Sequence, residues 1–263
     1  MDRRYLVPLA VLAALGLGAA AFTTLWAPRG PSPGPDQAYP AGAGPEHVDF
    51  SALEASGSNV SHAPRSYWDS YAIVYTAPPE RRLVEGDYYV NSTTGEIISE
   101  RWHDATVYIN GSTYAYVQPA DSVPEHRREE VESDPAFVYD DATGEYYRYD
   151  PHYGRVAPRN VGRHTAILDA YTWAAVDTTT HHGVPVITYR VTGTRTDVAD
   201  VPPASHGTLQ LGVEDGIVYD VTLDADARDY RYTYDVHPAP FPDHGWVDTA
   251  REVVSANRSS VRG

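Results

Sequence analysis

The chain has 263 residues, a formal net charge of −16 at pH 7 and no cysteine. The missing cysteines exclude disulfide bonds, thiol catalysis and cysteine-ligated metals, and the negative charge argues against nucleic-acid binding, which needs a positively charged surface. All 20 basic residues are arginine. An acidic surface without lysine is typical of a salt-loving organism with a GC-rich genome, because high salt screens acidic self-repulsion. We therefore interpret the chain as halophilic, against the alternative of an acidic surface without environmental meaning.

An uncharged, mostly apolar stretch at residues 5–26 follows Arg3 and Arg4. As a helix it is long enough to cross the roughly 30 Å hydrocarbon core of a bilayer. The positive-inside rule then places the N-terminus in the cytoplasm and the remainder outside. The same stretch also fits a signal peptide cleaved before Phe22, or loosely a twin-arginine export signal. We expect a single-pass protein of the cell membrane, or a secreted protein if the segment is cleaved.

Composition divides the chain into four parts. Residues 1–26 are the anchor or signal segment, and residues 27–47 form a linker rich in proline and glycine. Residues 48–254 are expected to fold as one extracytoplasmic domain, and residues 255–263 as a disordered polar tail.

The folded part is predicted to be mainly β. Runs of alternating apolar and polar residues, separated by turns that contain glycine or asparagine, indicate antiparallel hairpins. We expect a single curved antiparallel sheet of about a dozen strands, with one or two short helices at 123–133 and 161–170. The predicted strands are 70–76, 86–92, 96–102, 105–109, 113–118, 136–140, 145–149, 173–180, 184–192, 208–213, 217–223 and 229–236.

Tyrosine dominates the aromatic residues, with 21 tyrosines against four phenylalanines. A tyrosine on a sheet face buries its ring and leaves the hydroxyl for water or a partner. In the last two predicted strands, alternation places Tyr219, Tyr230, Tyr232 and Tyr234 on the inward face. These residues are candidates for lining a cavity for a lipid or another apolar ligand. The alternative is that they fill the core of the sheet.

The order of these elements, the stretch GTLQLGVEDGIVYDVTLDADARDYRYTYDV and the closing GWVDTA resemble the lipoprotein-carrier superfamily. That superfamily includes bacterial lipoprotein-localisation carriers and mycobacterial lipid-binding lipoproteins, and the chain looks closest to its uncharacterised, membrane-anchored haloarchaeal branch. The resemblance covers residues 65–250 and implies an incomplete barrel of about eleven strands wrapped over short helices, with an apolar hollow between. Many members of that branch would carry a lipid-attachment cysteine, which this chain lacks.

Four of the five asparagines lie in acceptor triplets for N-glycosylation. Chance would place fewer than one there, which suggests a glycosylated exported surface. Hairpin turns also favour asparagine, which is the competing explanation for Asn91 and Asn110. The four candidates are Asn59, Asn91, Asn110 and Asn257.

Eleven histidines raise the question of a metal, but none has HxxxH or HExxH spacing. On a strand, His181 and His182 would point to opposite faces, and on a turn they could bind one ion. Gly183 makes the turn itself a sufficient explanation, so we expect no metal and no cofactor. No GxSxG or other catalytic signature is present in the sequence, and no catalytic residue is assigned.

The expected function is that of a membrane-tethered extracytoplasmic binding protein that holds a lipid or other apolar ligand. The alternative is a cell-surface structural or interaction module with a filled core. A hydrolase with a triad hidden in the fold is the third possibility.

Overall fold

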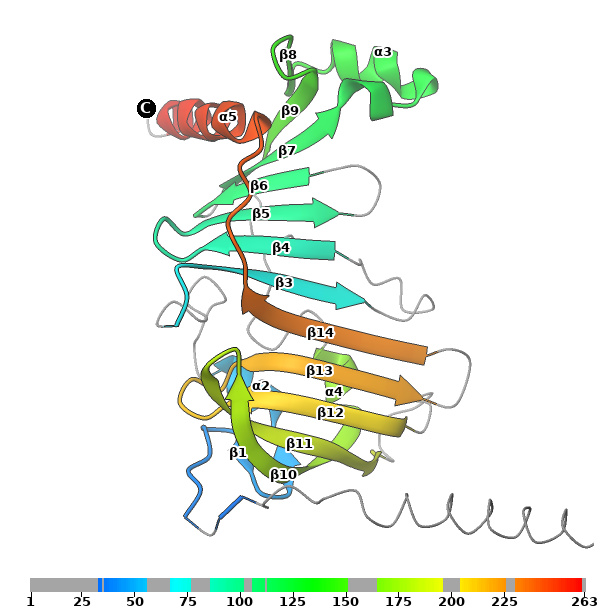
Figure 1. Cartoon of the computed structure of the whole chain (residues 1–263). Coiled ribbons are helices and arrows are strands. Elements are labelled where there is room, and N and C mark those ends of the chain that lie inside the picture. The colour runs from blue at the N-terminus through cyan, green and yellow to red at the C-terminus, as the bar shows by residue number, and fades with distance from the viewer. Residues whose placement is uncertain are drawn as a thin grey trace, which may run out of the picture.

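Twelve strands form one antiparallel sheet in the computed structural model, and within the described residues this sheet is not closed into a barrel (Figure 1). The structure describes residues 33–34, 36–55, 67–76, 86–101, 106–111, 113–150, 165–195, 204–225 and 230–261. The predicted anchor at 5–26 lies outside this part of the chain. Where the structure describes the chain, no helix is long and apolar enough to span a membrane.

The sheet consists of two meanders joined side by side. Strand β14 of the second meander pairs antiparallel with β3 of the first, with Tyr234 opposite Tyr75. The sheet order is therefore β10-β11-β12-β13-β14-β3-β4-β5-β6-β7-β9-β8, which leaves β10 and β8 at the edges. The first meander comprises β3 (Ser70–Thr76), β4 (Gly86–Asn91), β5 (Glu96–Arg101), β6 (Thr106–Asn110) and β7 (Thr113–Pro119), and the second β10 (Tyr171–His181), β11 (Val184–Thr194), β12 (Ala204–Gly212), β13 (Val218–Ala225) and β14 (Tyr230–Pro238). Strand β9 (Glu145–Asp150) pairs with β7, and β8 (Phe137–Asp140) pairs with β9 at the edge of the sheet.

The prediction of a mainly β protein built on one antiparallel sheet is confirmed, and each of the twelve predicted strands has a counterpart in that sheet. The resemblance implied about eleven strands. Each predicted hairpin forms, because its turn residues adopt the backbone conformation that the turn needs. Gly144, for example, has φ 72° between β8 and β9, and Gly183 has φ 91° between β10 and β11. Glycine adopts these left-handed angles without steric cost.

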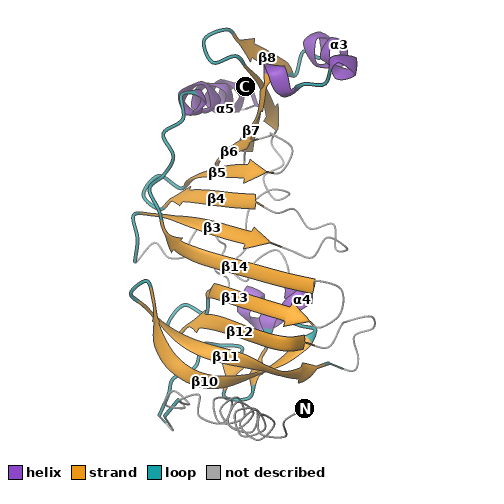
Figure 2. Cartoon of the chain, turned by 45° about the vertical axis from the view of Figure 1, so that its right-hand side comes forward, coloured by secondary structure: helices purple, strands orange, loops and turns teal. Residues whose placement is uncertain are grey.

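The short elements lie at the two ends of the sheet, as Figure 2 shows. Helices α3 (Glu125–Ser133) and α5 (Trp246–Val261) lie on opposite sides of the end formed by β7 to β9, whereas α2 (Phe50–Ala55) and α4 (Thr165–Leu168) lie near β12 and β13. The pair β1 (Ala43–Gly44) and β2 (His47–Val48) forms a separate small sheet, and η4 (Ala120–Ser122) precedes α3.

Helix α5 corrects the predicted C-terminal boundary. Residues 255–261, expected as a disordered tail, continue this helix. Its apolar side chains Val247, Ala250 and Val254 recur at helical spacing and are buried against strands β5 to β9. The polar composition of residues 255–263 thus reflects the exposed end of an amphipathic helix.

The two faces of the central sheet differ in chemistry. One, here called the tyrosine face, carries Tyr75, Tyr88, Tyr232 and Tyr234 within the largest apolar core. The opposite, acidic face carries a row of carboxylates on neighbouring strands, where Asp220 is opposite Asp235 and Asp87 is opposite Glu100. Farther along the sheet, on strands β5, β6, β7 and β9, the same face is apolar and packs against α5.

Candidate functional site

Three of the four predicted cavity-lining tyrosines lie together on the tyrosine face. Tyr230, Tyr232 and Tyr234 alternate along β14 and are buried, with Tyr232 at 0% exposure. Tyr234 pairs across to Tyr75, whose ring stacks on Tyr88 with centroids 6.0 Å apart and planes at 18°. The predicted alternation of buried and more exposed side chains along β14 is therefore observed. The tyrosine rings of β14, β3 and β4 lie next to one another on the tyrosine face.

Two buried hydroxyls on this face are unsatisfied. In the described part of the chain, the hydroxyl oxygens of Tyr88 and Tyr189 are shielded from water and have no hydrogen-bond partner. Burial raises the pKa of Tyr189, so its hydroxyl is a neutral donor. Buried polar atoms in native proteins are nearly always paired, so an unpaired hydroxyl marks a position for a further hydrogen-bonding group.

Tyr219 lies apart from the other three predicted residues. A β-bulge lets Leu211 pair with Val218 and Gln210 with Asp220, and Tyr219 is the extra residue between them. Its hydroxyl donates to Asp215 Oδ2 at 2.7 Å, and its ring packs edge-on against Trp68 with centroids 5.9 Å apart. The alternation expected from residue 217 onward is broken at Val218, which is buried, and holds from Tyr219 to Leu223.

Histidines gather beside Tyr219, at the end of the sheet. The turn between β10 and β11 places the rings of His181 and His182 with centroids 4.6 Å apart at 84°. The Nε2–H of His181 donates to the carbonyl oxygen of Val236 at 2.7 Å and lies 3.4 Å from Asp235 Oδ1. His237 Nδ1 lies 2.5 Å from the other carboxylate oxygen of Asp235. Residues far apart in the sequence thus share one polar cluster.

The electrostatics of this cluster are dominated by two facing carboxylates. Burial, together with the charge of Asp235, raises the pKa of Asp220 to about 6. Burial acts in the same direction on Asp235, but hydrogen bonds from His181 and His237 outweigh it and lower the pKa of that carboxyl. Burial alone would lower the pKa of His181, whereas its hydrogen bonds to Asp235 and Val236 raise it. The cluster is therefore built to hold positive charge next to Asp235.

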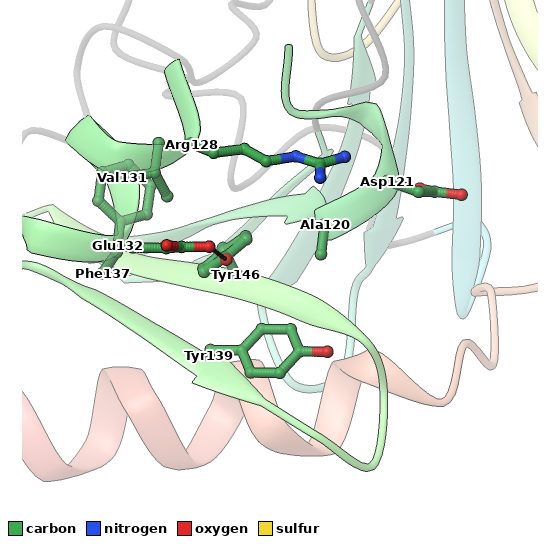
Figure 3. Close-up of a pocket in the computed structure, with 8 residues that line it drawn as sticks. All are labelled: Ala120, Asp121, Arg128, Val131, Glu132, Phe137, Tyr139 and Tyr146. Atoms are coloured by element: carbon green, nitrogen blue, oxygen red, sulfur yellow. Dashed lines mark hydrogen bonds between the residues drawn. The ribbon is translucent and has the colours of Figure 1, made fainter. Parts of the chain in front are cut away.

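A separate pocket of about 620 Å³ lies between α3 and the β8–β9 hairpin (Figure 3). Tyr139 and Tyr146 contribute rings with centroids 5.0 Å apart, and Arg128 and Glu132 contribute opposite charges. Tyr139 is 48% exposed, and Val138 beside it is 53% exposed on the same edge strand. The pocket is lined by Ala120, Asp121, Arg128, Val131, Glu132, Phe137, Tyr139 and Tyr146.

The predicted glycosylation sites differ in their surroundings. Asn91 is partly buried, and its Oδ1 accepts hydrogen bonds from the backbone of Thr93 and Thr94, both at 3.0 Å, as a turn-forming asparagine does. The Nδ2 group of Asn110 donates to Tyr108 at 3.4 Å, and that of Asn257 donates within α5 to Val253 at 2.8 Å. Asn59 lies outside the described residues.

Neither the histidine cluster nor the α3 pocket has a direct signal in the sequence. The turn at His181 and His182 is local, but Asp235 and His237 come from a strand more than fifty residues away. The only local signal was His182-Gly183 itself, which predicts the turn that brings the two rings together.

Comparison of the sequence with models of known protein families finds no match, and comparison with curated proteins finds no relative.

Proposed function

We propose that the chain is a membrane-tethered extracytoplasmic binding protein that holds an elongated amphipathic molecule, such as a lipid, against its tyrosine face. The observation that carries this proposal is the pair of buried, unpaired hydroxyls of Tyr88 and Tyr189 on an otherwise apolar surface. The apolar segment at 5–26, the linker at 27–47 and the resemblance to lipid carriers support the tether and the class of ligand.

The energetic argument concerns these two hydroxyls. Burying a hydroxyl without a partner costs about 1–3 kcal/mol, which a hydrogen-bonding group of a ligand would offset. Tyr189 lies on β11 and Tyr88 on β4, five strand positions apart in the sheet order. Adjacent strands are about 4.8 Å apart, so one ligand that reaches both must be long. The residues between them, such as Val221 and Ile73, are buried and apolar. A long apolar chain with polar groups near its ends fits this pattern.

The direct test is native mass spectrometry of the full chain, extracted in mild detergent from its own membranes. We expect an adduct with the mass of a lipid, and we expect the doubly substituted Tyr88→Phe, Tyr189→Phe protein to lose most of it. A matched control is Tyr219→Phe, because its hydroxyl is already satisfied by Asp215. Wild-type protein that carries no adduct, or an adduct retained equally by all three proteins, would contradict the proposal.

The second candidate function is that of a cell-surface interaction module, and the α3 pocket favours it. Exposed Tyr139 on edge strand β8 lines a pocket that also contains Arg128, and the neighbouring Val138 is exposed as well. Exposed apolar side chains at a sheet edge are typical of recognition surfaces. If wild-type protein carries no lipid, and if Tyr139→Ala abolishes capture of a surface partner while leaving folding intact, this second function is favoured.

A further inference from the structure

The β10–β11 turn has a backbone geometry that brings consecutive histidine rings together. His182 has φ 46°, and among the described residues it is the only one other than glycine with a positive φ. With Gly183 at φ 91°, both central residues of this two-residue hairpin loop have positive φ, as in a type I′ turn. In an extended strand the two imidazoles would point to opposite faces. Here the chain turns between them.

The β10–β11 hairpin is curved, and its turn therefore lies close to β14. β10 is at the edge of the sheet, with β11, β12 and β13 between it and β14. Figure 1 shows β10 bending strongly so that its end comes toward β14. The contacts of His181 with Val236 and Asp235 confirm this approach.

We propose that His181, His182 and Asp235 bind one divalent cation of the zinc class. One ligand atom from each of the three residues lies within 4.8 Å of the other two. Imidazole nitrogen and carboxylate oxygen are ligands that Zn²⁺, Co²⁺ and Ni²⁺ accept. Around tetrahedral zinc, with bonds of about 2.0–2.1 Å, neighbouring ligand atoms are about 3.4 Å apart. The three groups therefore need to close by up to about 1.4 Å, which a rotation of the exposed His182 ring would provide.

The surroundings resemble the outer shell of a metal site. Oδ1 of Asp235 lies near His181, and Oδ2 is hydrogen-bonded to His237. The hydrogen bond from His237 orients the Asp235 carboxylate, as outer-shell hydrogen bonds orient the ligands of known metal centres. Where Nε2 of His181 binds the ion, its hydrogen bond to the carbonyl of Val236 is exchanged for the metal bond. Asp220 adds a second carboxylate opposite Asp235, so a cation here would also relieve repulsion between like charges.

Such an ion would fasten the tip of the β10–β11 hairpin to β14. His181 comes from β10, His182 from the turn after it and Asp235 from β14, so the ion would cross-link β10 to a strand from which three other strands separate it in the sheet. Three protein ligands leave a further coordination position open, and His182 and part of Asp235 are exposed to solvent. The proposed ion would therefore be exchangeable and accessible to water or to a small ligand.

The test uses the full chain in detergent, freed of metal with a chelator and then titrated with Co²⁺ or Zn²⁺ at about 1 M KCl. High salt suppresses weak binding of cations to the acidic surface. We expect one Co²⁺ per chain with intense visible absorption bands of a low-coordinate site. We also expect the midpoint of thermal unfolding, Tm, to rise with the logarithm of the Zn²⁺ concentration.

Substitutions separate this site from adventitious binding. His182→Asn keeps a residue that tolerates positive φ and should abolish stoichiometric binding without lowering the Tm of the metal-free protein. His237→Gln, in the outer shell, should weaken binding about 10–100-fold. His126→Gln, on the exposed face of α3, is the matched control and should bind as wild type. The proposal is overturned if wild type binds no stoichiometric Co²⁺, or if His182→Asn binds it as tightly as wild type does.

Discussion

Arg251 of α5 forms a two-pronged ion pair with Glu96 of β5, with Nε 2.6 Å from Oε1 and one Nη 3.1 Å from Oε2. The carboxylate of Glu96 is almost fully buried and also accepts hydrogen bonds from Tyr108 and Thr94. Arginine suits this place because its planar fork matches a carboxylate. The contact fixes the C-terminal helix at one position over the sheet.

The first prediction concerns this ion pair. Arg251→Met keeps the apolar stem of the side chain and should lower the free energy of unfolding by about 2 kcal/mol, because a buried carboxylate loses a charged donor. Arg127→Met on α3 is the matched control, since its pair with Glu130 is exposed at 3.7 Å and should contribute less than about 0.5 kcal/mol. Urea denaturation of both variants measures the difference. Equal losses would show that the Glu96 contact contributes no more than a surface pair.

The second prediction is the pH dependence of the same contact. Burial alone would raise the pKa of Glu96, but hydrogen bonds from Arg251, Tyr108 and Thr94 lower it below its ordinary value of 4.5. A carboxyl with a depressed folded-state pKa stabilises the protein above its unfolded-state pKa. This contribution is lost as the pH falls through the folded-state value. The stability difference between wild type and Glu96→Gln should therefore stay constant at neutral pH and shrink below pH 4.5. A difference unchanged down to about pH 3 would contradict this assignment.

The strands could be predicted from the sequence because their determinants are local. Alternation such as Tyr230, Tyr232 and Tyr234, followed or preceded by a turn, specifies a hairpin without knowledge of the rest of the chain. Helix α5 was missed because its polar end resembles a tail. Its stripe of Val247, Ala250 and Val254 has helical spacing that could have revealed it.

The candidate sites were harder to predict because they depend on non-local geometry. The bulge at Tyr219 inserts an extra residue into β13, and the sequence carries no residue that demands it. The approach of His181 to Asp235 depends on the curvature of a whole hairpin, which alternation patterns do not encode. Pairing of β14 with β3, which aligns Asp235 near Asp87, likewise joins segments that are distant in the chain.

The third prediction concerns salt and the carboxylates of the acidic face. With a net charge of −16, the Tm of the chain should rise between 0.1 M and above 1 M salt as self-repulsion is screened. Asp87 lies directly opposite Glu100, and burial, followed by that neighbouring charge, raises the pKa of Asp87. Asp87→Asn should therefore stabilise the protein by up to about 1 kcal/mol at low salt, and by less above 1 M.

A matched control for this salt effect is Glu252→Gln, on the exposed side of α5. It changes the net charge by the same amount and should alter stability by less than about 0.5 kcal/mol. Thermal unfolding of wild type and both variants at several salt concentrations makes the comparison. A wild-type Tm indifferent to salt would count against a halophilic adaptation.

The fourth prediction uses the unpaired hydroxyls in ligand-free protein. Removing the hydroxyl in Tyr88→Phe or Tyr189→Phe should leave the delipidated chain as stable as wild type or stabilise it by about 1 kcal/mol, because an unsatisfied buried group is removed. Tyr219→Phe should instead cost about 1.5–3 kcal/mol, because Asp215 loses a donor to its carboxylate. Denaturant unfolding of the three variants after exhaustive delipidation tests this order. Losses for Tyr88→Phe and Tyr189→Phe as large as that for Tyr219→Phe would mean that their hydroxyls have partners within the protein.

The last prediction tests the register of β14. Tyr232 lies at 0% exposure on the tyrosine face, opposite Leu223 of β13, whereas Thr233 is opposite Thr222 on the other face. Tyr232→Ala should cost roughly 3–5 kcal/mol, as deletion of a large buried aromatic ring does, and about half as much if the ring lines a hollow with fewer neighbours. Thr233→Ala loses a hydrogen bond of 2.6 Å to Thr76 on β3 and should cost about 1 kcal/mol or less. Equilibrium unfolding of both variants in the same buffer gives the two costs. Because a slip of one residue would exchange the faces of every side chain on the strand, a larger cost for Thr233→Ala than for Tyr232→Ala would overturn this register.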